Sequence, residues 1–489
     1  MSSRSLDQTQ TPLLSQLQEC AQRDYAPFHT PGHKRGQGAS ARLQSLLGTE
    51  VLRADLPELP ELDNLFAPSS VIQQAQELAA AAFGADQTWF LANGSTCGVE
   101  AAILATCQPG DKILLPRNVH QSAIAGLILS GAVPVYLLPG YDAMTDLLYT
   151  VTPEQVAAAL QQHPDAKAVL LVSPTYHGVC ADIAAIAQIV HKVGIPLLVD
   201  EAHGAHFGFH PDLPTSALSA GADLAVQSTH KTLAGLTQAA MLHLKGDHIP
   251  PERIQQALQL VQSTSPSYLL LASLDAARHQ MAMEGKVLLE QTLELATWAR
   301  SQLANLPHLS LLSEAEVGKP GFFALDSTRL TVDVRHTGQD GFALDERLHT
   351  QYGVTAELPA LHHLTFILSL GDRPSSVQRL VQGFQAMLKM LPPASPASLP
   401  SQLFLQPWQA PLTPRQAFFA KTEQVAIADA VERISGELVC PYPPGIPVLM
   451  PGEVVSEVAI AHLQTVLAAG GSLTGCADPT LQSLKVVCR

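Results

Sequence analysis

The sequence predicts an α/β fold with a mostly parallel, seven-stranded sheet, followed by smaller α+β domains. Seven short and nearly continuous apolar runs lie between residues 87 and 246, and helical stretches such as DIAAIAQIVHKVG separate many of them. Strands that are apolar throughout are typical of a parallel sheet covered on both faces. The length of 489 residues exceeds what one core usually holds, and 46% hydrophobic against 15% charged residues fits a well-packed globular chain.

The first 310 residues divide into an arm and a large domain. Residues 1–70 are rich in proline, glycine and charge and predict an extended arm with little core of its own. Residues 71–310 form the predicted large domain, which opens with the helix VIQQAQELAAAAFG. Its seven strands are expected at QTWFLAN, KILLP, VPVYLLP, AVLLVSPTY, IPLLVDEAH, ADLAVQST and AAMLHLKG.

The remaining residues change in character. Residues 311–391 predict a small α+β domain, with strands at RLTVDVR and HLTFILSL and amphipathic helices at GFALDERLHTQYG and SVQRLVQGFQAMLKML. PPASPASLP, residues 392–400, reads as a linker. Residues 401–489 form a predicted C-terminal domain, in which RQAFFAKTEQVAIADAVERISG is expected to be helical and a proline-rich loop leads to a last helix.

Charge and cysteine usage narrow the class of protein. The net charge is −15, from 43 acidic and 28 basic residues, which argues against a nucleic-acid or membrane partner and is compatible with a cationic substrate. The seven cysteines are scattered, without a CxxC pair or the spacing of a metal site. The N-terminus has no apolar signal core, and no stretch looks long enough to span a bilayer. We therefore expect a metal-free protein of the reducing cytosol.

Four polar clusters follow predicted strands, where ligands of open α/β sheets bind. They are NGST (93–96), RNVHQS (117–122), DEAHGAH (200–206) and STHK (228–231). The last contains Lys231, a lone lysine after the apolar run ADLAV. An amine is costly to bury unless it is paired, neutral or covalently modified.

Each cluster has a structural and a functional interpretation. NGST could be a turn and helix cap, or a phosphate cradle in which Gly94 allows close approach and the hydroxyls of Ser95 and Thr96 bind. Asp200 could be a cap or an ion-pair partner, or a carboxylate that faces a protonated ring nitrogen. His120 could be structural, or its imidazole could stack on a flat aromatic ligand.

Together the clusters predict pyridoxal 5'-phosphate as a cofactor. That cofactor needs a lysine for its imine, an acidic partner for its pyridine nitrogen, a phosphate site and a group that sandwiches the ring. The sequence offers Lys231, Asp200, the NGST cluster and His120 for these tasks, and Ser228 and His230 can help to hold the phosphate. A buried amine is tolerated if it rests as an imine.

The chain resembles the bacterial-type ornithine/lysine/arginine decarboxylases, which are fold-type I, aspartate-aminotransferase-like pyridoxal phosphate enzymes. It is similar to their short biosynthetic forms, because it lacks the long receiver-like N-terminal domain of the large members. RNVHQS departs from the family by Val and Gln in place of Cys and Lys. The motifs that carry the resemblance are TPGHKRG, NGST, RNVHQS, SPTYHGVCADI, VDEAHGAH, STHKT, STSPSYLLLASLD and PYPPGIPVLMPGE.

The resemblance implies a role for each matching position. Lys231, Asp200 and His203 would be catalytic, with Lys231 or His203 as the proton donor. Thr264 would reach the phosphate of a neighbouring subunit, which makes the active site a property of a homodimer or higher homo-oligomer. The implied cofactor-binding residues are Ser95, Thr96, His120, Asp200, Ala202, His203, Ser228, His230, Lys231 and Thr264.

The implied reaction is decarboxylation of a basic L-amino acid to agmatine or a diamine and CO2 in polyamine metabolism. Arginine is favoured by analogy, and lysine and ornithine stay open. A carboxylate should bind the basic side chain, and Asp63 and Glu437 are candidates, with solvated loop acids as the equal alternative. The other hypotheses are a different reaction with the same cofactor, such as an aminotransferase, aldolase or desulfurase, and a non-catalytic regulatory relative.

Overall fold

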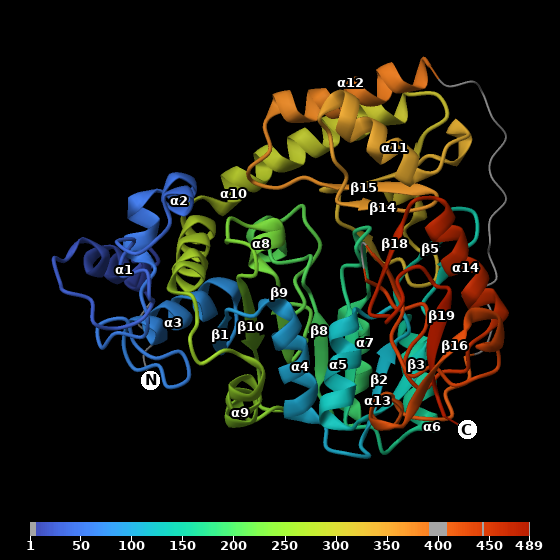
Figure 1. The fold of residues 1–489 in the computed structure, drawn as a ribbon, viewed down its shortest axis with the longest axis horizontal. Helices are drawn as coiled ribbons and strands as arrows, with labels where there is room; N and C mark the ends of the chain where they lie inside the picture. Colours follow the sequence, from blue (N-terminus) through green and yellow to red (C-terminus); the bar gives the residue numbers. More distant parts are fainter. Residues whose placement is uncertain (1–5, 391–407, 443–444, 489) are drawn as a thin grey trace. The chain divides into compact units, whose positions relative to one another are not determined.

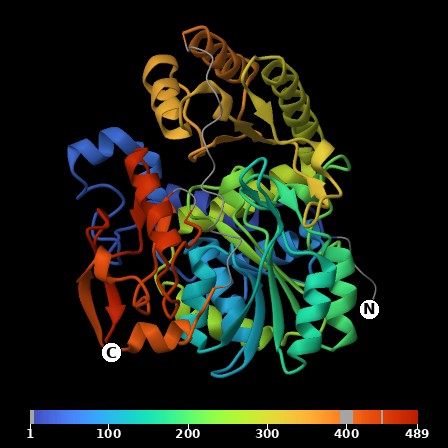
Figure 2. The ribbon, with the colours of Figure 1, turned by 90° about the vertical axis from the view of Figure 1, so that its right-hand side faces the viewer.

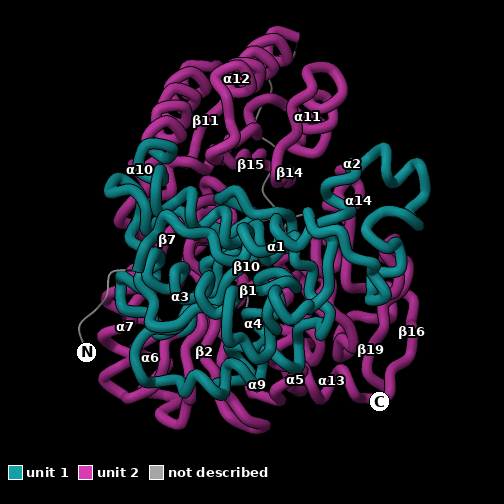
Figure 3. The backbone as a smooth tube through the Cα atoms, turned by 90° about the vertical axis from the view of Figure 1, so that its left-hand side faces the viewer, with its two compact units in different colours: residues 1–106, 198–289 teal, residues 107–197, 290–489 magenta. Residues whose placement is uncertain are grey.

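The structure is a computed structural model that describes residues 6–390, 408–442 and 445–488 (Figure 1). The expected linker at residues 392–400 lies outside these residues. The chain divides into two compact units, residues 1–106 with 198–289 and residues 107–197 with 290–489 (Figure 3). The division into arm, large domain, small domain and C-terminal domain stays a prediction.

The predicted seven-stranded sheet is confirmed. Its order is β1-β10-β9-β8-β6-β2-β3. β10 pairs antiparallel with β1 and β9, whereas the β9–β8, β2–β6 and β2–β3 ladders are parallel. The strands are β1 (Gln87–Leu91), β2 (Lys112–Pro116), β3 (Val133–Leu137), β6 (Ala168–Val172), β8 (Leu197–Asp200), β9 (Leu224–Gln227) and β10 (Ala240–Leu244).

The N-terminal arm is helical, and this corrects the expectation of an extended segment. It has no core of its own, because Leu13 and Leu17 of its first helix pack with Phe90 of β1 and Tyr268. Proline at the first position of α1 suits a helix start. The helices of this unit are α1 (Pro12–Gln22), α2 (Ala41–Ala54), α3 (Val71–Phe83), α4 (Gly94–Thr106), α8 (Thr229–Thr232), α9 (Pro251–Val261), the 3-10 turn η1 (Phe207–Phe209) and the first part of α10 (Tyr268–Ala304).

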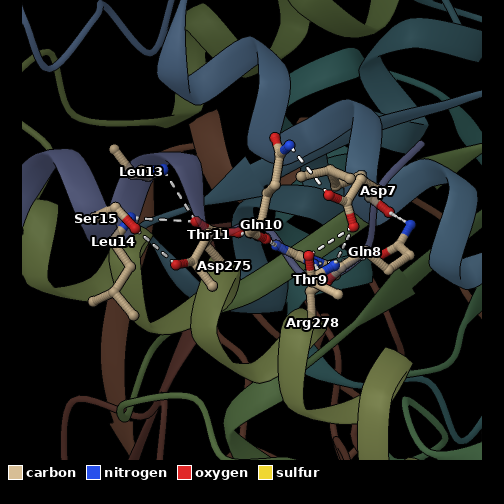
Figure 4. Close-up of polar contacts among 11 residues, drawn as sticks. Asp7, Gln8, Thr9, Gln10, Thr11, Leu13, Leu14, Ser15, Asp275 and Arg278 are labelled. Atoms are coloured by element: carbon tan, nitrogen blue, oxygen red, sulfur yellow. Dashed lines mark hydrogen bonds and ion pairs between the residues drawn. The ribbon is translucent and has the colours of Figure 1, made fainter.

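A buried ion pair on α10 ties down the start of the arm (Figure 4). Arg278 and Asp275 are fully buried, with Nη2 of the arginine 2.5 Å from Oδ1 of the aspartate. The guanidinium also donates to the carbonyl oxygens of Gln8 and Gln10, at 2.9 and 2.6 Å. The other carboxylate oxygen accepts from the backbone N–H of Leu13 at 3.0 Å. Both charged groups therefore bond to the arm that they anchor, although Nε of Arg278 has no hydrogen-bond partner among the described residues.

The second unit contains the strands and helices that the sequence predicts for residues 311–391. Its antiparallel sheet has the order β11-β13-β15-β14. Figure 2 shows α11 and α12 (orange) beside these strands, and residues of both helices share one core with β13, β15 and the end of α10. The elements are β11 (Ser310–Leu311), β13 (Arg329–Asp333), β14 (Leu358–Pro359), β15 (His363–Ile367), α11 (Gly341–Arg347), the π-turn η4 (Leu348–Tyr352) and α12 (Pro374–Leu388).

The second unit also contains three helices and two short pairs of antiparallel strands between residues 121 and 337. The helices are α5 (Gln121–Ser130), α6 (Pro153–Gln162) and α7 (Ile183–Lys192), with 3-10 turns η2 (Glu314–Glu316) and η3 (Arg335–Thr337). Two-residue strands pair as β4 (Tyr141–Asp142) with β5 (Leu147–Leu148) and β7 (Val179–Cys180) with β12 (Ala324–Leu325). None of the described helices combines the length and the apolar character that crossing a bilayer requires.

The helix expected at residues 415–436 is wrong beyond its first turns. α13 (Pro414–Phe419) begins with a capping box at Thr413 and ends at Ala420. The next residues form the strand β16 (Thr422–Ala426), which pairs with β19 (Ser483–Val487). Val425 packs against the core of this region, whereas its two neighbours Gln424 and Ala426, which lie on the opposite face of the strand, are exposed. The other elements are β17 (Cys440–Tyr442), β18 (Ser472–Thr474), α14 (Glu457–Ala468) and η5 (Ile427–Asp429).

Candidate active site

Lys231 lies one helical turn beyond the end of a buried strand. All four residues of β9 are buried, and the chain then enters α8, which carries the lysine (Figure 1). Its Nζ lies 3.2 Å from Nε2 of the buried His203. An ammonium has no acceptor, so the imidazole nitrogen accepts this hydrogen bond. Two of the predicted catalytic side chains are therefore in contact.

Asp200 ends the neighbouring strand. β8 and β9 are parallel, with Asp200 opposite Val226, so both carboxyl ends lie at the same edge of the sheet. Burial raises the pKa of Asp200, while the Lys231 ammonium and the backbone N–H of Ala202 act in the opposite direction. The carboxylate therefore gains from a cation placed against it. A protonated ring nitrogen is such a cation.

Two serines from different strand ends form a hydroxyl pair. Ser228 follows β9, and its Oγ donates to Oγ of Ser95 at 2.7 Å. Ser95 lies in the first turn of α4, next to the exposed Thr96 and after Gly94, whose φ of 73° suits glycine. A helix start presents free N–H groups and a positive dipole end. The predicted phosphate cradle thus has hydroxyls and helix start together.

Gly98, which sequence reasoning missed, lets α4 approach the sheet. A Cβ at this position would lie 2.6 Å from Cγ1 of Val226 on β9 and 2.7 Å from Cδ1 of Leu91 on β1. Both distances are far below van der Waals contact, so the helix sits closer than a side chain permits. The second glycine four residues after Gly94 was the available signal in the sequence.

His230 has a structural partner. Its Nδ1 lies 2.9 Å from the carbonyl oxygen of Ala239 and donates to it. Burial lowers the pKa of His230, the Ala239 contact raises it and the Lys231 ammonium lowers it. A neutral imidazole that donates from Nδ1 has only an acceptor at Nε2. The predicted contact with a phosphate thus requires protonation and stays a prediction.

The residues of α8 fit a bound anionic ligand. Oγ1 of Thr229 and Oγ1 of Thr232 are buried and have no hydrogen-bond partner among the described residues. A buried hydroxyl without a partner costs about 1–3 kcal/mol, so a ligand or water would stabilise it. With Lys231 between them and the hydroxyl pair of Ser95 and Ser228, this chemistry matches what pyridoxal phosphate needs.

Two predicted cofactor residues belong to other elements than those of this cluster. His120 belongs to the other unit and caps α5, with Nδ1 2.9 Å from Oγ of Ser122. This contact is the structural role weighed for it, and ring stacking stays a prediction. Thr264 lies on the exposed connection between α9 and α10. An exposed position is what a contact with a second subunit requires.

Arg117, three residues before His120, was also missed. Its guanidinium is buried and donates to the carbonyl oxygen of Pro447 and to Oε2 of Glu453, both at 2.8 Å. It also lies over the ring of Trp408, 4.3 Å from its centroid. Burial raises the pKa of Glu453, and Arg117 opposes this shift. The motif PYPPGIPVLMPGE is thereby fixed to the segment that carries His120.

The two proposed substrate carboxylates are occupied. Burial raises the pKa of Asp63, but hydrogen bonds from backbone amides including those of Ser69 and Ser70 outweigh this and hold it below its ordinary value. Glu437 accepts from the backbone N–H groups of Ala477 and Lys485, both at 2.8 Å. Both carboxylates bind backbone amides of neighbouring loops. The geometry therefore lends no support to a substrate role, which stays a prediction.

The fold and these side chains define a class of protein: an α/β enzyme with a lysine and a buried carboxylate at the carboxyl edge of its sheet. The comparisons identify the family. The model for the major domain of Orn/Lys/Arg decarboxylases matches residues 11–346, and the model for their C-terminal domain matches residues 397–478. The chain belongs to this decarboxylase family.

Relatives extend over the whole chain. The arginine decarboxylase of Bacillus subtilis is 38% identical over 99% of both chains, and that of Halalkalibacterium halodurans is 37% identical over 98% of both. The solved constitutive lysine decarboxylase of Escherichia coli aligns with a TM-score of 0.83 at 23% identity, over 99% of this chain and 82% of that one. At that identity the structural match supports the fold alone.

Proposed function

We propose that the protein decarboxylates L-arginine to agmatine and CO2, with pyridoxal phosphate held covalently by Lys231. The observation that carries the proposal is the contact of Lys231 with His203 beside the buried Asp200, in a member of this decarboxylase family. Arginine is favoured over lysine and ornithine because the full-length relatives at 37–38% identity are named arginine decarboxylases.

Each residue of the site has a task in this reaction. When bound, pyridoxal phosphate supplies an electron sink for the electron pair that the departing carboxylate leaves on Cα. Asp200 keeps the proton on the ring nitrogen, which stabilises charge that develops in the transition state. Ser95 and Ser228 hold the phosphate. Lys231 or His203 delivers a proton to Cα, which balances the loss of CO2.

We also propose a homodimer in which Thr264 of one subunit completes the phosphate site of the other. The support is the exposure of Thr264 and of large apolar side chains on the arm. α2 exposes Leu43, Leu46, Leu47 and Val51, and a group of exposed apolar side chains on one helix favours an interaction surface. The reducing cytosol is the proposed compartment, since all seven cysteines are free and five are buried.

Product analysis tests the proposal. Purified protein loaded with pyridoxal phosphate is given arginine, lysine or ornithine in parallel, and CO2, amine and keto acid are measured. We expect CO2 and agmatine from arginine in equal amounts, with the highest kcat/KM for arginine. Lys231→Ala should release none. Keto acid in place of CO2, or full activity of Lys231→Ala, would overturn the assignment.

A further inference from the structure

A chain of four buried side chains runs across β1, β10 and β9 to the end of β8. Thr88 Oγ1 lies 2.8 Å from Nδ1 of His243, whose Nε2 lies 3.1 Å from Oε1 of Gln227. Nε2 of Gln227 donates to Oε2 of Glu201 at 2.8 Å. Oε1 of Glu201 accepts from the backbone N–H of Ala217 at 2.7 Å. All four side chains are buried, each at most 3% exposed.

The donors of this chain all point towards Glu201. Because the amide nitrogen of Gln227 donates to the glutamate, its oxygen accepts from Nε2–H of His243. Burial lowers the pKa of His243 to about 3, so the ring is neutral and its Nδ1 accepts from the hydroxyl of Thr88. Phe83 stacks on this ring with centroids 4.7 Å apart and limits its rotation. His243 thus donates to Gln227 and Gln227 to Glu201, whereas Thr88 bonds only the far nitrogen of the His243 ring.

The Gln227–Glu201 link of the chain joins the two strand ends that carry the active site. Glu201 is the residue after Asp200, and Gln227 directly precedes Ser228. Removing one partner of a buried hydrogen bond costs about 1–3 kcal/mol, because the remaining group stays unsatisfied. The Glu201–Gln227 bond therefore adds a side-chain link to the backbone ladder of β8 and β9, in which the N–H of Glu201 donates to the carbonyl oxygen of Val226 at 2.9 Å.

We infer that Glu201 and Gln227 are positioning residues, which hold Asp200 at a fixed distance from Ser228 and Lys231 so that one ring can meet all three. This inference rests on the proposed function. Neither side chain touches the reacting atoms: both act through their neighbours in the chain. The general principle is that a displacement of about 1 Å in a reacting group costs on the order of 10²-fold in rate.

Because the carboxyl group of Glu201 is buried, it requires a hydrogen-bond donor such as the Gln227 amide. Burial raises the pKa of Glu201 to about 8, against the opposing hydrogen bonds of Gln227 and Ala217. A variant that leaves this carboxyl without its amide partner must move or rehydrate it, and the strand end moves with it. Thr88, at the far end of this hydrogen-bonded series, bonds to neither β8 nor β9 through its side chain and provides a matched buried control.

The test uses the full chain loaded with pyridoxal phosphate. The variants are Glu201→Leu, Gln227→Met and the control Thr88→Val. For each we measure the thermal midpoint, the dissociation constant of pyridoxal phosphate, the pH midpoint of its visible absorbance band, and kcat and KM for arginine. The cofactor readouts stay informative if arginine is not the substrate, so failure of this inference is distinct from failure of the proposed function.

Glu201→Leu and Gln227→Met should lower kcat by roughly 10²-fold with KM unchanged within about twofold, and should raise the dissociation constant at least about tenfold. They should also shift the pH midpoint of the absorbance band. Thr88→Val should lower the thermal midpoint alone. If the two chain variants also lose only thermal stability, the side chains are ordinary core residues and the inference is overturned.

An exchange variant keeps the test decisive if Glu201→Leu does not fold. In Glu201→Gln combined with Gln227→Glu, the new amide at 201 accepts from Ala217 and donates to the new carboxylate at 227, which accepts from His243. Every donor and acceptor is matched again, and the charge is retained. The cofactor dissociation constant should return to within about threefold of the original, whereas Gln227→Glu alone opposes two carboxylates. An exchange variant no better than Gln227→Glu would refute the positioning role.

Discussion

Replacing Gly98 by alanine should loosen the phosphate cradle. The added Cβ would lie 2.6 Å from Cγ1 of Val226, where 3.4 Å marks ordinary contact, so α4 or β9 must move by roughly 0.8 Å. Val226 is stiff because it is β-branched and sits in a central, fully buried strand. The helix is the part that moves, and its first turn carries Ser95.

The expected magnitude follows from two opposing effects. Overpacking of a core costs about 1–3 kcal/mol, and alanine gains about 1 kcal/mol over glycine in a helix interior, which leaves a net loss of about 0–2 kcal/mol. A shift of roughly 0.8 Å would stretch the 2.7 Å contact between Ser95 and Ser228 to about the limit of a hydrogen bond. The affinity for pyridoxal phosphate should therefore fall together with stability.

Urea unfolding and titration with pyridoxal phosphate measure both effects. Gly208→Ala is the control, because a Cβ there meets nothing within 4 Å and the backbone has no positive φ. Val226→Ala should partly rescue Gly98→Ala, since it removes the atom that is struck. A Gly98→Ala protein with unchanged stability and unchanged cofactor affinity would show that the close approach of α4 does not matter.

Three further changes have defined outcomes. Arg117→Met should cost about 3–5 kcal/mol in urea unfolding, because it leaves the buried Glu453 without its cation; a loss below about 1 kcal/mol would contradict this pairing. His363→Gln should flatten the pH dependence of the free energy of unfolding. Burial lowers the pKa of His363 to about 3, and His177 adds to this shift. The neutral ring therefore contributes fully to stability above about pH 6.5, and this contribution falls by up to about 1.4 kcal/mol per pH unit as the pH drops towards 3. The check is urea unfolding from pH 4 to 7, and parallel curves for both proteins would refute it. Arg278→Met should release the start of the arm to limited proteolysis, and an arm that stays protected would show that the ion pair does not hold it.

The α/β class and the seven strands could be predicted because their signals are local. Each strand is an apolar run bounded by turn residues, and no distant partner is needed to recognise it. The strand Thr422–Ala426 could not be found in this way, since its partner Ser483–Val487 lies about 60 residues later and overrides a local helical pattern. The 37-residue helix α10 was not predicted either.

The residues of the candidate site also divide into those with a local sequence signal and those that depend on a distant partner. Lys231 and Asp200 could be found because each follows an apolar strand. The Glu201–Gln227 bond and the Arg117–Glu453 pair could not, since their partners are 26 and 336 residues apart. Asp63 was a poor candidate for a reason visible only in the structure: a carboxylate among loop amides accepts their hydrogen bonds, and a sequence does not distinguish this from a site that awaits a ligand.

A bonded cation, more than burial, distinguishes a structural carboxylate from a functional one. Burial raises the pKa of both Glu453 and Asp200. Oε2 of Glu453 accepts from the Arg117 guanidinium at 2.8 Å and from the backbone N–H of Met450 at 2.9 Å, whereas its Oε1 has no hydrogen-bond partner among the described residues. Among the described residues, Asp200 accepts one backbone hydrogen bond, from Ala202 at 3.2 Å. The charge of the Lys231 ammonium lowers the pKa of Asp200, against the effect of burial. A carboxylate left in that condition at a strand end gains most from an added cation, and the ring nitrogen of the proposed cofactor provides it.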